Sequence, residues 1–268
     1  TNGYYLSSIP NIIDRLKKCH IDSFQITLDG APEDHNQTRR LKNGGRTFDK
    51  MLEGIELLYD KHFNISVRIN ISKKNYKNLN RLFDILEDKG LKDLKIYFGQ
   101  LIDSDTDHPE VYFNQEEYAK VVEELYSLLR KRKFKYGLDD HYPVNARPCI
   151  ANRIDSVVID CFGNIYKCRS QVGEFEKRIG NVCELNDQTV DEAMREINWF
   201  EWSPFQYDEC RECIYLPLCM GGCPYFLYDD DDTLPKCDAW KYNLEFFIKQ
   251  KVLSLKLKEE FCNDSEKK

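Results

Sequence analysis

Seven cysteines in the second half of the chain are the residues whose type and spacing could do chemistry. They are Cys149, Cys168, Cys210, Cys213, Cys219, Cys223 and Cys237, and the last five are separated by two, five, three and thirteen residues. Thiolates two to five residues apart can converge on one metal centre, because a loop lets their sulfurs point inward while backbone amides donate to them. The spacing predicts metal binding, and sulfur ligation suits both iron–sulfur clusters and zinc.

The distribution of the cysteines argues against a disulfide scaffold. Ten of the eleven cysteines in this 268-residue chain lie at or beyond Cys149. Secreted disulfide domains are short and self-contained, whereas here a long cysteine-poor region comes first. Cys19, Cys183 and Cys262 fall outside the pattern and are interpreted as ordinary cysteines. The five histidines show no metal-ligand spacing and are expected to be structural or surface residues.

An α/β region precedes these cysteines. The first 140 residues alternate short β-branched or aromatic runs with longer amphipathic patterns, which is typical of βα units around a parallel sheet. Strands are predicted at 24–28, 65–71 and 94–98, and helices at about 9–18, 47–61, 78–89 and 116–131. A charged, glycine-rich loop is predicted from residue 29 to residue 45. Three strand–helix units cannot close an eight-stranded barrel, so the pattern predicts the later part of an open or partial barrel.

The second half is predicted to be a loop-rich module closed by a helix over about 238–258. The predicted domains are therefore 1–140, the partial barrel, and 141–268, the cysteine-rich module with its terminal helix. Thr1, Asn2 and Gly3 look like the end of a strand and the turn after it. On this interpretation, N-terminal sequence is expected to be missing.

The cysteine order resembles the SPASM domain, the twin-cluster module at the C-terminus of many radical S-adenosylmethionine (SAM) enzymes. The phrases at 160–168 and 179–182 are also typical of it. In that family one auxiliary [4Fe-4S] cluster is held by the cysteines that match Cys210, Cys213, Cys219 and Cys237. The other is held by those that match Cys149, Cys168 and Cys223, with a variable fourth ligand. Cys161 is a candidate for that fourth place, and the final spacing of thirteen is shorter than usual in the family.

The first half resembles the later part of a partial (β/α)6 radical SAM barrel. The turn at 1–3, the strand phrase at 25–30, the pair at 35–36 and the arginines at 39–40 match this family in order and distance. Polar side chains at the carboxyl ends of such strands surround the cofactor. The match makes candidate SAM contacts of Asn2, Gln25, Thr27, Arg39, Arg40 and Asn70. Other interpretations remain: Thr27 as a β-former, Asp29-Gly30 as a turn, and the arginines as solvated.

The resemblance implies an oxidoreductase that modifies a peptide or protein, such as a maturase of ribosomally made peptides. Reductive cleavage of SAM would give a 5′-deoxyadenosyl radical that abstracts a hydrogen atom. The family's catalytic cluster sits on Cys-x3-Cys-x2-Cys, and no such spacing occurs in this chain. We therefore expect that motif, with SAM and a third [4Fe-4S] cluster, in a longer protein, and no activity from this chain alone. The resemblance also implies a reducing partner such as flavodoxin or ferredoxin.

Two alternatives remain open. Anaerobic sulfatase maturases place a catalytic aspartate after the second cysteine of the module, where this chain has Arg169; this argues against formylglycine formation. The other alternative is a non-catalytic peptide-binding module stabilised by zinc. A net charge of −7 argues against nucleic acid as a partner. No apolar stretch approaches the ~18 to 20 residues that a membrane span needs, so a cytoplasmic protein is expected.

Overall fold

The computed structural model describes residues 1–101, 110–137, 149–184, 187–225 and 237–253. Cys262 and the end of the predicted closing helix lie outside these residues. The chain divides into two compact units. Unit 1 comprises residues 1–142 and 242–268, and unit 2 comprises residues 143–241. Each unit is described by itself below.

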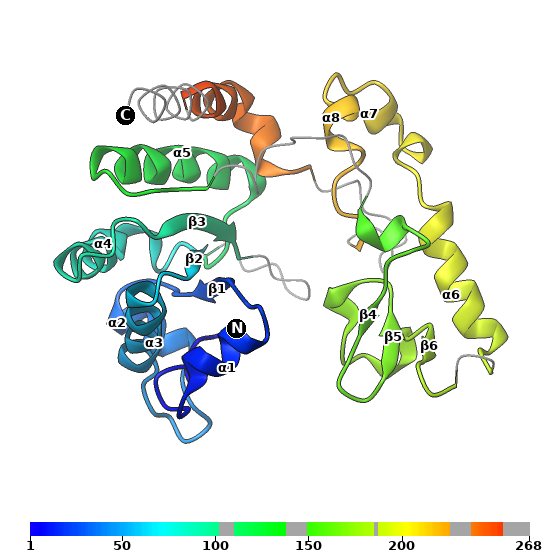
Figure 1. The fold of residues 1–268 in the computed structure, drawn as a ribbon. Helices are drawn as coiled ribbons and strands as arrows, with labels where there is room; N and C mark the ends of the chain where they lie inside the picture. The colour runs from blue at the N-terminus through cyan, green and yellow to red at the C-terminus, as the bar shows by residue number, and fades with distance from the viewer. Residues whose placement is uncertain (102–109, 138–148, 185–186, 226–236, 254–268) are drawn as a thin grey trace, which may run out of the picture. The chain divides into compact units, whose positions relative to one another are not determined.

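Unit 1 is built on a parallel sheet of three strands in the order β1-β2-β3 (Figure 1). The strands are β1 (Ser23–Thr27), β2 (Asn64–Ile71) and β3 (Lys95–Gln100), close to the predicted ranges. The helices of this unit are α1 (Ile12–Lys18), α2 (Pro32–Thr38), α3 (Phe48–Asp60), α4 (Leu79–Asp88) and α5 (Gln115–Lys131), with a 3-10 turn η1 (Tyr76–Asn78) before α4. The alternation of parallel strands with helices confirms the predicted α/β fold class.

The two faces of this sheet differ in character. One face carries Ile26, Val67, Ile69, Ile96 and Phe98, all with no exposed surface. Amphipathic helices α3, α4 and α5 bury their own apolar stripes in the same core, and the ring of Phe98 contacts that of Tyr126 in α5 at 5.0 Å. The other face carries polar residues of β1 and β2, since side chains alternate along a strand. The apolar face provides the stability, and the polar face is available for function.

Residues at both ends of helix α5 explain why it begins and ends close to its predicted limits. Asn114 accepts the backbone N–H of Glu117, and the Glu117 carboxylate accepts the backbone N–H of Asn114, which makes a complete capping box. Arg130 and Lys131 in the last turn suit the helix dipole. The helix predicted over 116–131 is observed at Gln115–Lys131.

Two elements differ from the predictions. The segment predicted as loop after β1 contains α2, which begins with Pro32 at its first turn, followed by Glu33 and Asp34; proline and acidic residues suit a helix N-terminus. The predicted closing helix begins with the 3-10 turn η6 (Ala239–Asn243), which spans the boundary between the units after Lys241, and continues as helical residues 244–253 in unit 1. Asn243 donates to Glu123 of α5 and Tyr136 donates to Gln250. These contacts explain why the closing helix lies with unit 1, not with the predicted domain 141–268.

Unit 2 contains a small antiparallel sheet in the order β4-β5-β6. Its strands are β4 (Val158–Ile159), β5 (Asn164–Tyr166) and β6 (Gly180–Asn181). Its helices are α6 (Val190–Glu201), α7 (Asp208–Arg211) and α8 (Leu216–Cys219), with 3-10 turns η2 (Ile150–Asn152), η3 (Arg169–Gln171), η4 (Phe175–Lys177) and η5 (Pro204–Gln206). Such short elements make unit 2 the loop-rich module that the sequence predicts.

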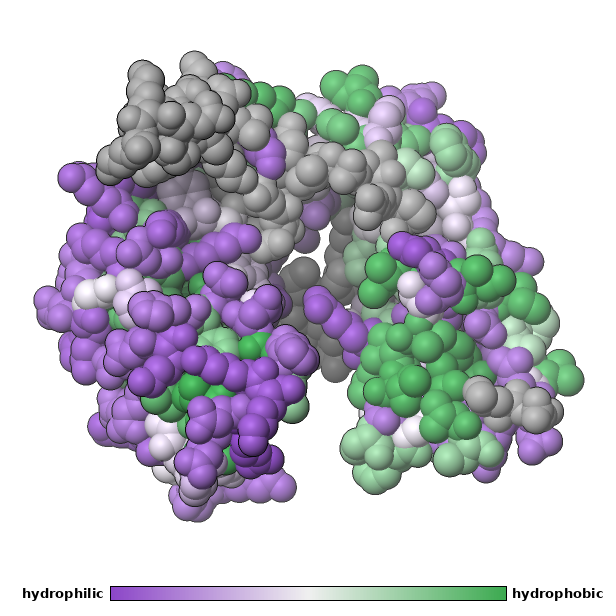
Figure 2. All heavy atoms as spheres, viewed as in Figure 1, coloured by the Kyte–Doolittle hydropathy of each residue, from purple (hydrophilic) through white to green (hydrophobic). Residues whose placement is uncertain are grey.

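Apolar side chains remain exposed on unit 2. Val157, Ile159 and Val182 are each more than a third exposed. Ile159 pairs with Ile165 in the register of the sheet, and Ile165 pairs with Gly180. The side chains of Ile159 and Ile165 therefore lie on the same face of the sheet. Figure 2 shows the broad apolar area over these strands. Among the described residues, no helix is long and apolar enough to cross a lipid bilayer.

The loop after β2 is fixed by one buried side chain. The Asn75 amide donates to the carbonyl oxygens of Asp29 and Asn70, both at 2.7 Å, and its oxygen accepts the backbone N–H of Ser72 at 2.9 Å. Asn75 therefore ties the segments that follow β1 and β2 to each other. Without it, two carbonyls and one N–H in a buried position would lose their partners.

We predict that Asn75→Ala lowers the free energy of opening of the β1 and β2 segments by about 3 kcal/mol, because each unsatisfied buried group costs about 1 to 3 kcal/mol. Hydrogen exchange of peptides that contain these strands measures this quantity. The matched control is Asn78→Ala, three residues further on, whose amide bonds only the carboxylates of Glu33 and Asp34 in a more exposed position. Equal effects of the two variants would refute the role of Asn75.

Candidate functional site

A buried carboxylate organises the polar edge of the parallel sheet. Asp29 follows β1 and is 5% exposed. Its Oδ1 accepts the Asn70 amide at 2.9 Å, and its Oδ2 accepts Arg39 Nε at 2.5 Å and the Thr38 hydroxyl at 3.3 Å. The carboxylate thus joins β2 and the end of α2 at the carboxyl ends of the strands, where parallel α/β folds bind ligands. A buried charge needs such partners, because an unpaired one is costly.

A buried histidine supports the same edge beside the carboxylate. His35 has no exposed surface; its Nδ1 accepts the backbone N–H of Asp29, and its Nε2 lies 3.2 Å from Thr47 Oγ1. The Thr47 hydroxyl donates to the carbonyl of Arg39. Since Nδ1 accepts, the proton of the neutral ring belongs on Nε2, which donates to Thr47. Burial lowers the pKa of His35 to about 4, and the Asp29 carboxylate opposes that shift only in part.

The polar face of the sheet also carries an arginine that lies across β3. Arg68 Nε donates to Asn70 Oδ1 at 2.9 Å. A Cβ at Gly99 would lie 2.6 Å from Arg68 Nε and 2.7 Å from its Nη2. Arg68 pairs with Tyr97 and with Thr27 in the parallel register, so the three residues share one face. A half-buried guanidinium in this place is a ready donor for an anionic group.

The structure brings some of the predicted SAM contacts together. Arg39 and Asn70 meet at Asp29. Gln25 and Thr27 lie on the polar face of β1, Gln25 exposed and Thr27 half-buried. These four residues lie at or beside the polar edge. Their role as cofactor contacts stays a prediction.

Two further predicted contacts make other interactions. Asn2 is exposed and accepts the backbone N–H of Tyr4, and its neighbour Gly3 packs against Ile26 of β1. Arg40 is exposed and forms an isolated bridge with Arg46. Sequence reasoning missed Asp29 and Arg68 as members of the polar edge. Asp29 enters the sequence analysis only within the strand phrase 25–30 and its turn, and the alternation of β2 is the signal that could have indicated Arg68.

We predict that unit 1 loses stability in mild acid because of His35. The pKa of this side chain falls from its ordinary value of 6.5 to about 4 in the fold, so the unfolded chain binds the proton more readily. The contribution of His35 to the free energy of unfolding is therefore fully present above about pH 6.5. It is lost as the pH drops toward 4, by on the order of 3 kcal/mol. Hydrogen exchange of the β1 and β2 peptides at pH 7 and pH 4.5 measures the loss. His35→Gln should remove most of this pH dependence, and the exposed His20→Asn is the control; an unchanged slope in His35→Gln would contradict the prediction.

Four cysteines of unit 2 lie close to one another. Cys210, Cys213, Cys219 and Cys237 are all partly buried. Burial raises the pKa of the Cys210 thiol, and the other three thiols raise it further by charge repulsion. Burial also raises the pKa of Cys219, to which Cys213 and Cys237 add. These mutual effects require short distances between the thiols, so the chain gathers sulfurs from α7, α8 and the segment before η6.

The four gathered thiols are soft ligands, which suit both iron–sulfur clusters and zinc. Within the described parts of the chain, no group of three or more His, Cys, Asp or Glu side chains is arranged to hold a metal ion. A [4Fe-4S] cluster requires four thiolates that each bind a different iron, which sets the sulfurs farther apart than around one zinc ion. That Cys210, Cys213, Cys219 and Cys237 hold a cluster stays a prediction.

The loop after Cys219 contains three successive residues with a left-handed backbone, two of which are glycines. Met220, Gly221 and Gly222 all have positive φ. The backbone N–H of Gly221 bonds to Cys219 and lowers the pKa of its thiol against the larger effect of burial. A Cβ at Gly221, where φ is 92°, would lie 2.5 Å from the Trp202 ring and 2.6 Å from Pro204. The close approach of this backbone to Trp202 sets the path of the loop that carries Cys219.

Of the other predicted ligands, Cys161 and Cys168 adjoin the strands of the small sheet, whereas Cys223 is exposed in the segment after α8. Cys149 precedes η2, Cys168 follows β5, and Cys161 is exposed in the turn between β4 and β5. The Cys168 sulfur accepts the backbone N–H of Ser170 at 3.4 Å. Next to it, the Lys167 ammonium is buried and donates to the carbonyls of Arg153 and Ser156. These bonds hold the end of β5, next to Cys168. A shared cluster at Cys149, Cys168 and Cys223, with or without Cys161, stays a prediction.

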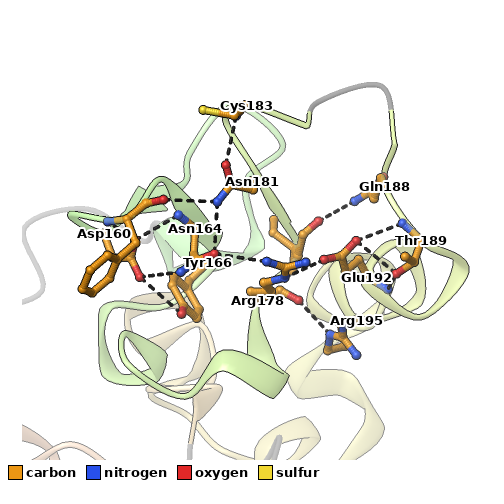
Figure 3. A network of polar contacts seen from close by, with 12 residues as sticks. Asp160, Asn164, Tyr166, Arg178, Asn181, Cys183, Gln188, Thr189, Glu192 and Arg195 are labelled. Atoms are coloured by element: carbon orange, nitrogen blue, oxygen red, sulfur yellow. Dashed lines mark hydrogen bonds and ion pairs between the residues drawn. The ribbon is translucent and has the colours of Figure 1, made fainter.

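A polar network holds this sheet against α6 (Figure 3). The Asp160 carboxylate accepts the backbone N–H groups of Phe162 and Asn164. Arg178 pairs with the Glu192 carboxylate at 2.8 Å and also donates to Asn164. Glu192 completes the capping box of α6 with Thr189. The turn that carries Cys161 and the strand that leads to Cys168 are therefore held by specific hydrogen bonds.

We predict that Gly221→Ala destabilises unit 2 by about 2 to 4 kcal/mol, because it adds a steric clash to the strain of positive φ. Gly173→Ala is the matched control: its φ is 101°, but nothing lies within 4 Å of its added Cβ. Tryptophan fluorescence in urea reports on unit 2, since all three tryptophans lie there. If both variants shift the urea midpoint equally, the contact with Trp202 does not matter.

Comparison with known proteins identifies the first part of the chain. The family model of the radical SAM superfamily matches residues 1–86. Residues 1–86 belong to the radical SAM superfamily. This match includes β1, α2, α3 and β2, and thus Asp29, Arg39, Arg68 and Asn70 of the polar edge.

Two curated relatives extend the likeness along the chain. A cysteine-type anaerobic sulfatase-maturating enzyme of Clostridium perfringens is 22% identical over 213 residues, which is 74% of this chain and 57% of the relative. An AdoMet-dependent heme synthase of Methanosarcina barkeri is 22% identical over 82% of this chain and 67% of its own length. The chain therefore spans little more than half of the first relative.

A solved structure shows the same fold. Native anSMEcpe with bound AdoMet and Cp18Cys peptide superposes with a TM-score of 0.60 and 17% identity, covering 94% of this chain and 73% of that one. The fold of this chain is thus shared with anSMEcpe, from the parallel sheet into the cysteine-rich unit. The match confirms the α/β fold class.

Proposed function

We propose that this chain is part of a radical SAM enzyme that modifies a peptide or protein substrate and carries two auxiliary [4Fe-4S] clusters in unit 2. The single observation that carries the proposal is the gathering of Cys210, Cys213, Cys219 and Cys237 in a chain whose first 86 residues belong to the radical SAM superfamily. A relative that matures sulfatases and a similar structure that holds AdoMet and a peptide support the substrate class. The heme synthase relative shows that related chains also serve other substrates.

The residues of unit 1 would bind and orient the cofactor. SAM bound together with a third [4Fe-4S] cluster supplies a 5′-deoxyadenosyl radical. At the polar edge, Asn70 and Arg39 are held by the Asp29 carboxylate, so their positions are set before a ligand arrives. Thr27 and Gln25 would contact polar groups of the cofactor from β1, and the Arg68 guanidinium would attract its carboxylate. A preorganised polar site loses less entropy on binding than a mobile one.

The residues of unit 2 would hold the auxiliary clusters in separate places. The four thiols around α7 and α8 would bind one cluster, and Cys149, Cys168 and Cys223, with Cys161 as a candidate fourth ligand, would bind the other. The chain would need a segment with Cys-x3-Cys-x2-Cys spacing for catalysis, and a flavodoxin or ferredoxin to supply electrons. Arg169 after Cys168 is exposed and basic, so a proton-accepting aspartate is not available there. This favours a peptide modification other than formylglycine formation.

We predict that the chain, purified without air or reconstituted with iron and sulfide, binds about eight irons and is brown because the clusters absorb visible light. The double variant Cys210→Ala/Cys237→Ala should lose about four irons and Cys149→Ala/Cys168→Ala the other four, measured by iron and sulfide analysis. Cys161→Ala tests the fourth ligand, and Cys183→Ala, an exposed cysteine outside the pattern, is the control. A colourless protein with stoichiometric zinc would support the peptide-binding module instead and refute the proposal.

A further inference from the structure

A lysine lies against one of the four gathered thiols. Lys241 follows Cys237 by four residues, and its Nζ lies 3.2 Å from the Cys237 sulfur. This is within the distance of an N–H to sulfur hydrogen bond. The ammonium also acts on a second thiol of the group, since its charge opposes the rise in the pKa of Cys210 that burial causes. One positive charge therefore lies within reach of two sulfurs that come from different parts of the chain.

The backbone around this lysine is firmly held. Lys241 belongs to η6, and its neighbours Ala239 and Trp240 are each 5% exposed. The Trp240 ring meets the Tyr215 ring edge to face, with their centroids 6.0 Å apart. Tyr215 lies between Cys213 and Cys219 in the sequence. The aromatic contact thus joins the turn that carries Lys241 to the loop that carries two other thiols.

A cluster on four thiolates is an anion whose charge grows when it is reduced. With four cysteine thiolates, the [4Fe-4S] unit changes from a net charge of −2 to −3 on accepting one electron. The electron comes from dithionite in a titration, and Lys241 stays an ammonium throughout, so no proton moves. A fixed positive charge stabilises the more negative state by more than the less negative one. Hydrogen bonds to the cluster sulfurs and nearby charge are the features by which proteins adjust such potentials.

We propose that Lys241 sets the reduction potential of the cluster on Cys210, Cys213, Cys219 and Cys237 by its charge and its bond to the Cys237 sulfur. The inference rests on the proposed function, because it requires a cluster at these four thiols. Lys241 is a positioning and electrostatic residue of this cluster and contacts a ligand sulfur, not the substrate. It makes this cluster easier to reduce than the same four thiolates would be without the ammonium.

The test measures the potential of this one cluster by a redox titration followed by electron paramagnetic resonance. The background is Cys149→Ala/Cys168→Ala, which leaves the four-cysteine cluster as the only auxiliary one. In this background, Lys241→Met should lower the equilibrium constant for reduction about tenfold, which is about 59 mV for one electron. Lys241→Arg keeps the charge and should retain most of the parent potential. Lys177→Met is the control for loss of a positive charge. Lys177 lies in η4, and its ammonium pairs with the Glu174 carboxylate.

The possible outcomes separate this inference from the proposed function. A parent that binds no iron at the four thiols would overturn the proposed function and with it the inference. A parent with iron whose potential is the same in Lys241→Met would overturn the inference alone, as would equal shifts in Lys241→Met and Lys177→Met. If Lys241→Met does not hold the cluster, Lys241→Gln is titrated instead, with the same expected direction. A lower potential in a variant with the parent iron content, restored by Lys241→Arg, supports the role of the ammonium.

Discussion

The buried carboxylate of Asp29 is the interaction on which the polar edge of unit 1 depends. It receives hydrogen bonds from an amide of β2, a guanidinium at the end of α2 and a threonine hydroxyl. A charge with little access to water holds these partners in place because separation would leave it unpaired. His35 accepts the backbone N–H of the same residue in its neutral form. The side chains of the edge are thus held by hydrogen bonds from the chain itself.

Unit 2 meets a different constraint, which is to hold mutually repelling thiols close together. Their proximity is unfavourable for the charged forms, as the raised pKa values of Cys210 and Cys219 show. Short helices, a glycine backbone pressed against Trp202 and the contact of Tyr215 with Trp240 bring the sulfur-bearing segments together without a large core. A bound metal centre would offset the repulsion and would couple metal binding to the folding of this region.

Periodicity predicted the strands and the long helices of unit 1 well, because burial of one face imposes a regular spacing of apolar residues. It failed at α2, a polar helix with only one buried residue, His35, where no apolar stripe exists to detect. The cysteine spacing indicated four thiols that the structure brings together. The sequence could not reveal Asp29 as an organising group, because an aspartate before a glycine looks the same in a sequence whether it lies exposed in a turn or is buried. Nor could it assign the closing helix to unit 1, since that depends on contacts such as the one between Asn243 and Glu123.

The absence of a side chain at Gly99 links two positions on neighbouring strands. Arg68 can lie across β3 only because no side chain of Gly99 occupies that space. Any homologue with a larger residue at this position must redirect the arginine or replace it. The two positions are therefore expected to change together during evolution, and such paired changes would mark a branch of the family that binds a different chemical group at this edge of the sheet.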